Sequence, residues 1–256
     1  MIDLILLSGF MGEESDYAKL PDFLPKDIYN IVYVDIREEK YWNGQKPCFE
    51  NFDLSTLYRK EHQQIFVGYS LGGRILAQYF LKEVTSMLSK EKKENLGEET
   101  LASTDLKNEN PMSYSLLDEK HQLVLLASAL GCEEDEIPTR IELEDKIYRN
   151  IKNLDFESFA VYWESMPLFR HSVKRRFKST WTSGELEIFF ENFRQSQQTH
   201  LKEFVKSPWV HLLVGELDKK YCGLYKNYDH QILKGAGHRL PLDAPEEIAG
   251  YLLQLG

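Results

Sequence analysis

Short, nearly continuous apolar runs recur along the chain and constrain its fold more than any other feature. Runs such as IDLILL, QIFVGY and QLVLLA lack the alternation of a half-exposed strand, so each is expected to be buried on both faces of a sheet. The predicted strands are Ile2–Leu7, Ile31–Ile36, Gln64–Tyr69, Gln122–Ala127, Val210–Gly215 and Gln231–Leu233. Helical patterns follow at Leu71–Val84 and Ala244–Leu255. This alternation predicts an α/β fold with a mostly parallel sheet flanked by helices.

Two segments interrupt the alternation of strands and helices. Residues 86–119 are polar and rich in Lys, Glu, Asn and Ser, which predicts a surface insertion. Residues 133–207 contain amphipathic helical stretches and no convincing strand, so they are predicted to form a helical lid over a site. The predicted organisation is therefore a core over 1–132, the lid over 133–207, and the rest of the core over 208–256.

Composition and charge exclude several classes of protein. The 256 residues are 42% hydrophobic, enough for a full core, and carry a net charge of −10, which disfavours binding to nucleic acid or to an anionic membrane. The cysteines are too far apart for a disulfide framework or a zinc site: Cys48, Cys132 and Cys222. No segment has the pattern of a signal peptide or a membrane span, so a cytoplasmic protein without membrane insertion is expected. The oligomeric state stays open.

One pentapeptide carries the pattern of a catalytic serine. Gly68-Tyr69-Ser70-Leu71-Gly72 matches G-x-S-x-G, and it stands between a predicted strand and a predicted amphipathic helix. The flanking glycines permit a tight turn that raises Ser70 above the sheet. The amino terminus of the following helix favours negative charge that develops there. The motif therefore predicts that Ser70 is the reactive hydroxyl.

A serine hydroxyl needs a histidine to take its proton and an acid to orient that histidine. Asp218 follows the strand predicted at Val210–Gly215, and His238 lies on the loop after the next strand. Both residues should reach the carboxyl edge of the sheet, where ligands bind in open α/β folds. The predicted triad is Ser70, Asp218 and His238, with Glu216 as the competing acid.

Backbone N–H groups are expected to stabilise an oxyanion beside Ser70. One is the N–H of Leu71, the residue after the serine, and the other belongs to the loop after the first strand. That loop reads Ser-Gly-Phe-Met-Gly over residues 8–12, so Phe10 is the second candidate donor.

Together these motifs resemble the α/β-hydrolase fold. A narrower resemblance is to the 2-succinyl-6-hydroxy-2,4-cyclohexadiene-1-carboxylate synthases of menaquinone biosynthesis. It is carried by SGFMG at 8–12, GYSLGGR at 68–74, WESMPLF at 163–169, GELDKKY at 215–221 and GAGH at 235–238. The triad motifs occur throughout the fold, whereas GYSLGGR combined with WESMPLF is much more specific.

The resemblance implies an elimination. The substrate would be a small anionic metabolite, a cyclohexene carboxylate with succinyl and enolpyruvyl groups. Ser70, deprotonated by His238, would abstract a ring proton, and pyruvate would leave. Neither a metal nor an organic cofactor is implied. The resemblance also implies these substrate-binding residues: Tyr69, Arg74, Arg140 and Trp163.

The chain departs from the family pattern in two places. Ser8 stands where the family loop has a histidine, and a further family arginine has no clean counterpart. The nearby candidates for that arginine are Arg170, Arg175 and Arg176. Two alternatives therefore stay open: a carboxylesterase or C–C bond hydrolase that uses the same triad through an acyl-enzyme, and a non-catalytic binding protein with the same pocket.

Overall fold

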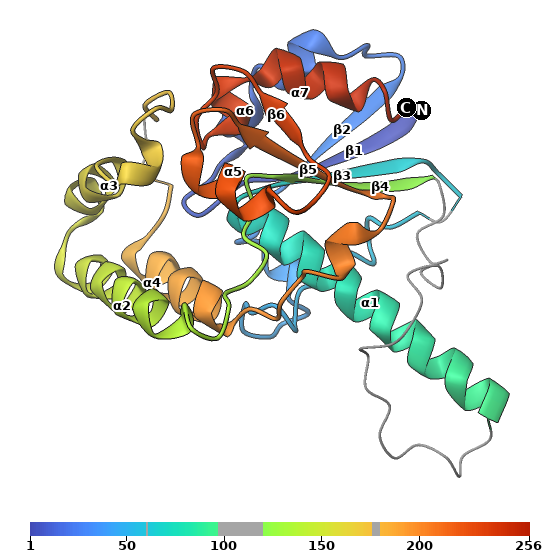
Figure 1. Cartoon of the computed structure of the whole chain (residues 1–256), viewed down its shortest axis with the longest axis horizontal. Helices are drawn as coiled ribbons and strands as arrows, with labels where there is room; N and C mark the ends of the chain where they lie inside the picture. Colours follow the sequence, from blue (N-terminus) through green and yellow to red (C-terminus); the bar gives the residue numbers. More distant parts are fainter. Residues whose placement is uncertain (60, 97–119, 176–179) are drawn as a thin grey trace.

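A parallel β-sheet forms the centre of the molecule (Figure 1). The computed structural model describes residues 1–59, 61–96, 120–175 and 180–256. The strands are β1 (Ile2–Leu7), β2 (Tyr29–Val34), β3 (Gln64–Tyr69), β4 (His121–Leu126), β5 (Val210–Gly215) and β6 (Gln231–Leu233). Their order is β2-β1-β3-β4-β5-β6, and every neighbouring pair is parallel. Parallel neighbours need crossover connections, which carry helices onto the two faces of the sheet.

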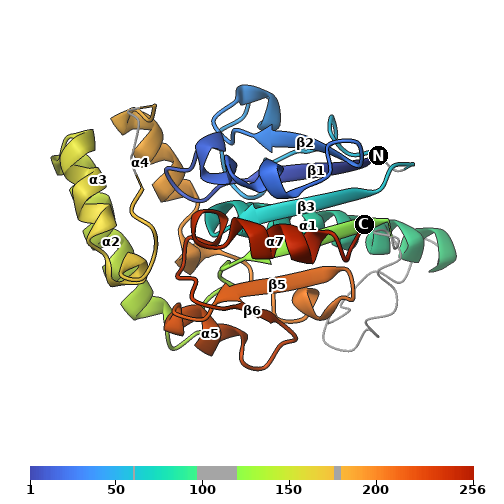
Figure 2. The same cartoon turned by 90° about the horizontal axis from the view of Figure 1, so that it is seen from above.

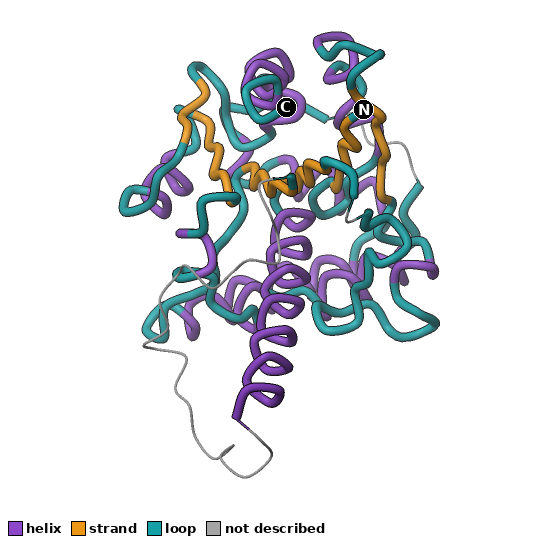
Figure 3. Tube along the Cα trace, turned by 90° about the vertical axis from the view of Figure 1, so that its right-hand side faces the viewer, coloured by secondary structure: helices purple, strands orange, loops and turns teal. Residues whose placement is uncertain are grey.

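Helices cover both faces of the sheet. The helices of the described residues are α1 (Leu71–Leu96), α2 (Ile137–Asn153), α3 (Phe156–Glu164), α4 (Ser183–Asn192), α5 (Lys219–Tyr225), α6 (Leu240–Asp243) and α7 (Pro245–Leu252). Helix α1 packs against β3 and β4 on one face, while α7 lies over the other (Figures 1 and 3). Every residue of β1 and β3 is buried, which explains the lack of polar alternation in these segments.

The strand predictions agree closely with the structure. The predicted bounds of β1, β3, β5 and β6 are those observed. The prediction for β2 was two residues late, because the chain leaves the strand at Asp35, whose carboxylate accepts a hydrogen bond from the Arg37 backbone N–H at 2.9 Å. The prediction for β4 was one residue late. Ala127 has φ of 46° and so leaves the extended conformation.

The helix after β3 is longer than predicted. It was expected to end at Val84, but α1 continues to Leu96, and Figure 3 shows its last turns projecting from the body. The sequence from Ser86 to Leu96 is polar, yet Lys and Glu are good helix formers, so polarity there did not mean a loop. The surface insertion expected over 86–119 stays a prediction: α1 covers its beginning as far as Leu96, and residues 97–119 lie outside the described residues.

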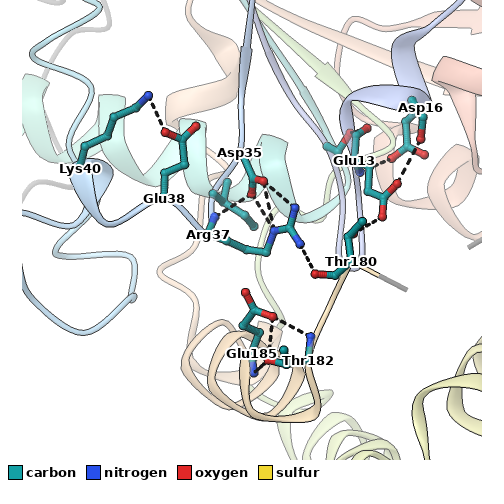
Figure 4. A network of polar contacts seen from close by, with 12 residues as sticks. Glu13, Asp16, Asp35, Arg37, Glu38, Lys40, Thr180, Thr182 and Glu185 are labelled. Atoms are coloured by element: carbon teal, nitrogen blue, oxygen red, sulfur yellow. Dashed lines mark hydrogen bonds and ion pairs between the residues drawn. The ribbon is translucent and has the colours of Figure 1, made fainter. Parts of the chain in front are cut away.

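Helices α2, α3 and α4 form a separate group beyond the carboxyl ends of the strands (Figure 2). The described part of segment 133–207 contains no strand, as expected. One attachment of this group to the sheet is shown in Figure 4, where the Arg37 guanidinium donates to the Thr180 carbonyl at 2.7 Å. The Thr180 hydroxyl donates to the Glu13 carboxylate in the same network. The role of these helices as a lid, with bounds 133 and 207, stays a prediction.

Candidate active site

Ser70 forms a one-residue turn between β3 and α1. Its φ is 51°, a left-handed conformation that is unfavourable for a residue with a side chain. Backbone hydrogen bonds hold it there: its N–H donates to the Leu126 carbonyl at 2.9 Å, and its carbonyl accepts from the Arg74 N–H at 3.1 Å. A Cβ at Gly72 would lie 2.5 Å from the Ser8 carbonyl oxygen, so only glycine permits this close approach.

Asp218 and His238 form a buried pair at the carboxyl edge of the sheet. The His238 Nδ1–H donates to Asp218 Oδ2 at 2.6 Å, and the two side chains are 1% and 2% exposed. The other carboxylate oxygen of Asp218 accepts from the Tyr221 N–H at 3.3 Å, which caps α5. Glu216 points elsewhere, since its carboxylate accepts from the Gly235 N–H at 2.9 Å. The geometry thus joins His238 to Asp218 and leaves its Nε2 able to accept a proton.

The electrostatic surroundings favour a neutral His238. Burial lowers the pKa of the imidazole below its ordinary value, because a charged ring would lose its hydration. Asp218 acts in the opposite direction, while Lys220 and Arg239 lower the pKa further. A neutral imidazole is the form that can take a proton from a hydroxyl.

Ser70 lines the same cavity as Asp218. Among the hydrogen bonds of the described residues, none links Ser70 with His238. The ring of Tyr69, next to Ser70, lies 5.5 Å from the His238 ring. Such bonds are often long in an unliganded site and shorten when substrate binds. The candidate oxyanion donors Phe10 and Leu71 line the same cavity as Ser70.

A cavity of about 710 Å³ opens over Ser70. It is lined by residues from the strand ends and from α2, α3 and α4. Trp163 forms part of its wall, with its ring 5.1 Å from the Phe10 ring and 5.7 Å from the Phe169 ring. A flat apolar wall of this kind suits a six-membered ring in a ligand.

Arg74 brings a buried positive charge to this cavity. The side chain is 9% exposed, and no ion pair within the described part of the chain includes it. Its Nε donates to Gln198 Oε1 at 2.5 Å, and its Nη2 to the Phe193 carbonyl at 2.6 Å. Burial, followed by repulsion from Arg140, lowers the pKa of Arg74 to about 10. The guanidinium remains charged at neutral pH; Glu144 acts on it through space, but no carboxylate of the described residues forms an ion pair with it.

Arg140 also lines the cavity, but it has a partner. Its Nε donates to the Glu144 carboxylate at 2.6 Å, one turn along α2. Glu144 is fully buried and accepts further hydrogen bonds, including one from the Ser196 hydroxyl at 2.5 Å. The pair therefore holds Arg140 in a fixed position at the cavity wall.

Tyr69 does not line the main cavity, unlike the other predicted substrate-binding residues. It lines a small recess of about 20 Å³ beside the main cavity, together with Asp16, Arg175 and Arg239. Ser70 and Trp163 line both spaces. A contact between Tyr69 and a substrate stays a prediction.

Comparison with known proteins gives a clear result for the fold. No protein-family model matches the sequence. The structure of MenH from S. aureus superposes with a TM-score of 0.72 at 17% identity, covering 99% of this chain and 92% of that one. An α/β-hydrolase from a Paenibacillus species gives a TM-score of 0.51 at 12% identity, covering 100% and 99%. The chain has the α/β-hydrolase fold.

An esterase and a sequence relative complete the comparison. A thermophilic esterase from Thermogutta terrifontis gives a TM-score of 0.56 at 12% identity, covering 99% of this chain and 89% of that one. In sequence, a Haemophilus influenzae protein provisionally named 2-succinyl-6-hydroxy-2,4-cyclohexadiene-1-carboxylate synthase is 34% identical over 92 residues. That match spans 32% of this chain and 35% of the relative.

Within the α/β-hydrolase fold, the departures from the synthase pattern have local explanations. Ser8 is buried and donates to the Glu13 carbonyl at 3.1 Å, so it supports its own loop. Of the candidate lid arginines, Arg170 lines the main cavity, and Arg175 pairs with Asp16 at the recess. Arg176 lies outside the described residues.

Several charged residues of the cavity were missed by the sequence analysis, Lys146 and Lys219 among them. Lys220 and Arg194 line the cavity, and buried Glu144 holds Arg140. Lys220 had a signal, since it stands two residues after Asp218 at the start of a helix. Glu144 had one too, at the i+4 position from Arg140 on a predicted helix. Arg194 had none, because only the packing of α4 brings it to the cavity.

The described residues contain neither a metal-binding cluster nor a membrane-spanning helix. Among them, no group of three or more His, Cys, Asp or Glu side chains is placed to hold a metal ion. In the same part of the chain, no helix is long and apolar enough to cross a membrane.

Proposed function

We propose that this protein eliminates pyruvate from a cyclohexene carboxylate bearing succinyl and enolpyruvyl groups, the reaction of 2-succinyl-6-hydroxy-2,4-cyclohexadiene-1-carboxylate synthases in menaquinone biosynthesis. Support comes from the motifs that the chain shares with that family, the partial match to the H. influenzae protein, and the likeness in fold to S. aureus MenH. A cytoplasmic location belongs to the same proposal.

The observation that carries the proposal is the buried, unpaired charge of Arg74 beside Ser70. A chain with a net charge of −10 would gain nothing from burying a guanidinium without a counterion, unless a ligand supplies the anion. Arg140 and Lys220 line the same cavity. A ligand with several carboxylates matches this set of cations.

The proposed roles follow from the geometry. His238, held by Asp218 and neutral through burial, takes the proton of the Ser70 hydroxyl. The resulting alkoxide removes a ring proton, the electron pair forms a ring double bond, and the bond between the ring carbon and the enolpyruvyl oxygen breaks. The departing pyruvate enolate takes up the proton held by His238 and becomes pyruvate, which returns the imidazole to its neutral form. The N–H groups of Phe10 and Leu71 donate to the oxygen on which negative charge develops.

A carboxylesterase or C–C bond hydrolase is the second candidate. The same three side chains would serve it, with Ser70 forming an acyl-enzyme, and the T. terrifontis esterase shares the fold. The two reactions differ in the substrate charge that they need. A neutral ester substrate has no group that would pair with the cations of this cavity.

One assay separates these functions. Purified protein is supplied with the succinyl-enolpyruvyl-cyclohexene carboxylate while pyruvate is measured, and nitrophenyl esters are tested in parallel. Pyruvate release that disappears in Ser70→Ala is the expected result. Rapid ester turnover without pyruvate would replace the lyase by an esterase, and no turnover of either substrate would favour a binding protein.

Arg74 gives a second test of the lyase. Arg74→Ala should lower kcat/KM for the anionic substrate by more than about tenfold. That loss corresponds to about 1.5 kcal/mol of transition-state stabilisation, the scale of a hydrogen bond to a charged group. Arg74→Lys should recover part of that loss, because it keeps the charge without the planar fork. Unchanged kcat/KM in both variants would show that Arg74 does not bind the substrate.

A further inference from the structure

Arg239 directly follows His238 and contacts the helical segment over the cavity. Its two terminal nitrogens donate to the two carboxylate oxygens of Glu164, the last residue of α3. Its Nη1 also donates to the Val173 carbonyl at 3.1 Å. The guanidinium carbon lies 4.0 Å from the centre of the Phe169 ring. Glu164, Val173 and Phe169 all belong to the segment predicted as the lid.

Backbone contacts continue this attachment on both sides of Arg239. The Arg239 N–H donates to the Ser172 hydroxyl at 3.0 Å. The Asp243 carboxylate accepts from the Val173 N–H at 2.7 Å and from the Gly237 N–H at 3.0 Å. A Cβ at Gly237 would lie 2.6 Å from the His171 carbonyl oxygen, so the two backbones are in close contact. The loop of His238 and residues 171–173 are packed as one unit.

The ion pair at the centre of this unit is withdrawn from water. The Arg239 side chain is 4% exposed and that of Glu164 is 19% exposed. Removal of either partner would leave a charge in a poorly hydrated place, which is strongly unfavourable. The bidentate geometry also fixes the direction of both side chains, which a single point charge would not do.

The aromatic ring of Phe169 connects the Arg239–Glu164 pair with His238 and with the cavity wall. The Phe169 ring contacts the Arg239 guanidinium, and its centre lies 5.7 Å from that of the His238 ring. The Phe169 ring centre also lies 5.7 Å from that of Trp163, the residue before Glu164. A shift of Glu164 would therefore move the Trp163 wall of the cavity and loosen the packing that buries His238.

We propose that Arg239 is a positioning residue that fastens residues 163–173 to the loop of His238, so that the cavity wall and the proposed base keep a fixed relation. The inference rests on the proposed function only in taking His238 as the base. The contacts themselves predict that Arg239 and Glu164 act as one unit. They also predict that losing either partner frees the segment above the cavity.

Hydrogen exchange measures the attachment without reference to any reaction. Backbone amides of residues 163–173 should exchange about tenfold faster or more in Arg239→Gln and in Glu164→Gln, because local opening no longer breaks the buried pair. The double variant should exchange no faster than either single one, since each already removes the shared contact. Exchange equal to that of the wild-type protein in both folded single variants would overturn the proposal.

The pKa of His238 gives a second readout, at the loop to which the segment is fastened. The charged and titratable groups around this ring are Asp218, Lys220, Arg239, Tyr69 and Tyr221. Arg239→Gln removes a cation and admits water, and both changes raise the pKa of the imidazole. Titration of the His238 ring by NMR, assigned with His238→Gln, should therefore show an upward shift.

Arg37→Gln is the matched control. It also breaks a contact between the core and the helical segment, at the Thr180 carbonyl, but away from His238. It should leave the pKa of His238 unchanged, and an equal shift in this variant would contradict the positioning role. If Arg239→Gln does not fold, Arg239→Lys and Glu164→Gln test the same exchange. A wild-type protein without lyase or esterase activity would defeat the proposed function, while exchange and titration would still decide the role of Arg239.

Discussion

At the scale of single residues, burial sets the chemistry of the two groups that flank Ser70. It lowers the pKa of Arg74 to about 10 and that of His238 below its ordinary value, because a poorly hydrated environment disfavours the charged form. Arg74 nevertheless stays charged at neutral pH, whereas His238 becomes neutral. Arg74 thus offers a cation to an anionic ligand in the cavity, and the neutral His238 ring is able to take a proton from a hydroxyl.

The acid partner of His238 can be identified by paired substitutions. Asp218→Asn should lower kcat by about a hundredfold or more, because the amide no longer favours the imidazolium that forms during proton transfer. Glu216→Gln should change kcat less than about twofold, since its carboxylate contacts the Gly235 N–H and an amide oxygen can replace it. Equal losses in the two variants, measured with pyruvate release, would contradict the geometric assignment.

Activity should persist below the ordinary histidine pKa and fall as His238 gains a proton. Because the folded pKa is lowered from 6.5, the acidic limb of kcat/KM should lie below that value. Lys220→Gln removes a cation that disfavours the imidazolium, so the limb should move to higher pH. Lys226→Gln changes the same charge at the end of α5, away from the cavity, and should leave the profile in place. If the acidic limb does not move in Lys220→Gln, the Lys220 charge does not affect the pKa of His238.

At the scale of elements, the site depends on the close contact between the first turn of α1 and the end of β1. The Cβ of an alanine at position 72 would lie 2.5 Å from the Ser8 carbonyl oxygen and 2.6 Å from that of Leu7. Such contacts force backbone movement. The turn that carries Ser70 and the loop that carries Phe10 are therefore mutually fixed.

Two glycine substitutions test this close approach. Gly72→Ala should lower the free energy of unfolding by about 3 kcal/mol, the upper range for overpacking a tight site. Gly223→Ala in α5 meets nothing within 4 Å and should raise stability by about 0.5–1 kcal/mol, as expected for a helix interior. Urea unfolding followed by circular dichroism measures both. A neutral Gly72→Ala would show that the first strand and the Ser70 turn can move apart.

The start of α4 provides a test of local helix energetics (Figure 4). The Thr182 hydroxyl accepts from the Glu185 N–H at 3.2 Å, and the Glu185 carboxylate accepts from the Thr182 N–H at 2.6 Å, which is a capping box. Thr182→Ala should destabilise α4 by about 1 kcal/mol. Thr182→Ser keeps the hydroxyl and should remain near wild type. Hydrogen exchange within α4 separates the two, and equal exchange would assign the cap no role.

At the scale of the whole molecule, an acidic protein surrounds a cationic cavity. The net charge of −10 acts over long distances, whereas Arg74, Arg140 and Lys220 act at contact range. At an ionic strength of ~0.1 M the screening length is about 10 Å, so the distant repulsion is already weak. The cavity cations then decide how an anion binds.

Salt should therefore weaken anion binding and leave neutral ligands unaffected. Between ~0.1 M and ~0.5 M salt, KM for the polyanionic substrate should rise by about two- to fivefold, because added ions screen the attraction in the open cavity. KM for a neutral nitrophenyl ester should stay the same over that range. A KM for the anion that falls with salt would mean that repulsion by the protein surface dominates.

Much of the fold could be predicted because it depends on local patterns. Continuous apolar runs mark buried parallel strands, and glycines around Ser70 mark a turn between a strand and a helix. The bounds were less predictable where one residue ends an element, as Asp35 ends β2 and Ala127 ends β4. The full length of α1 was missed, because polar residues can extend a helix as well as form a loop.

The sequence by itself determined the parallel sheet, the turn at Ser70, and the placing of Asp218 and His238 after successive strands, since these follow from periodicity and chain order. Tertiary structure alone decided which acid meets His238, that Arg74 is buried without a counterion, and that Arg239 reaches Glu164 across 75 positions of sequence. These depend on packing between distant segments. Side-chain partners and loss of hydration are properties of that packing, and no local pattern specifies them.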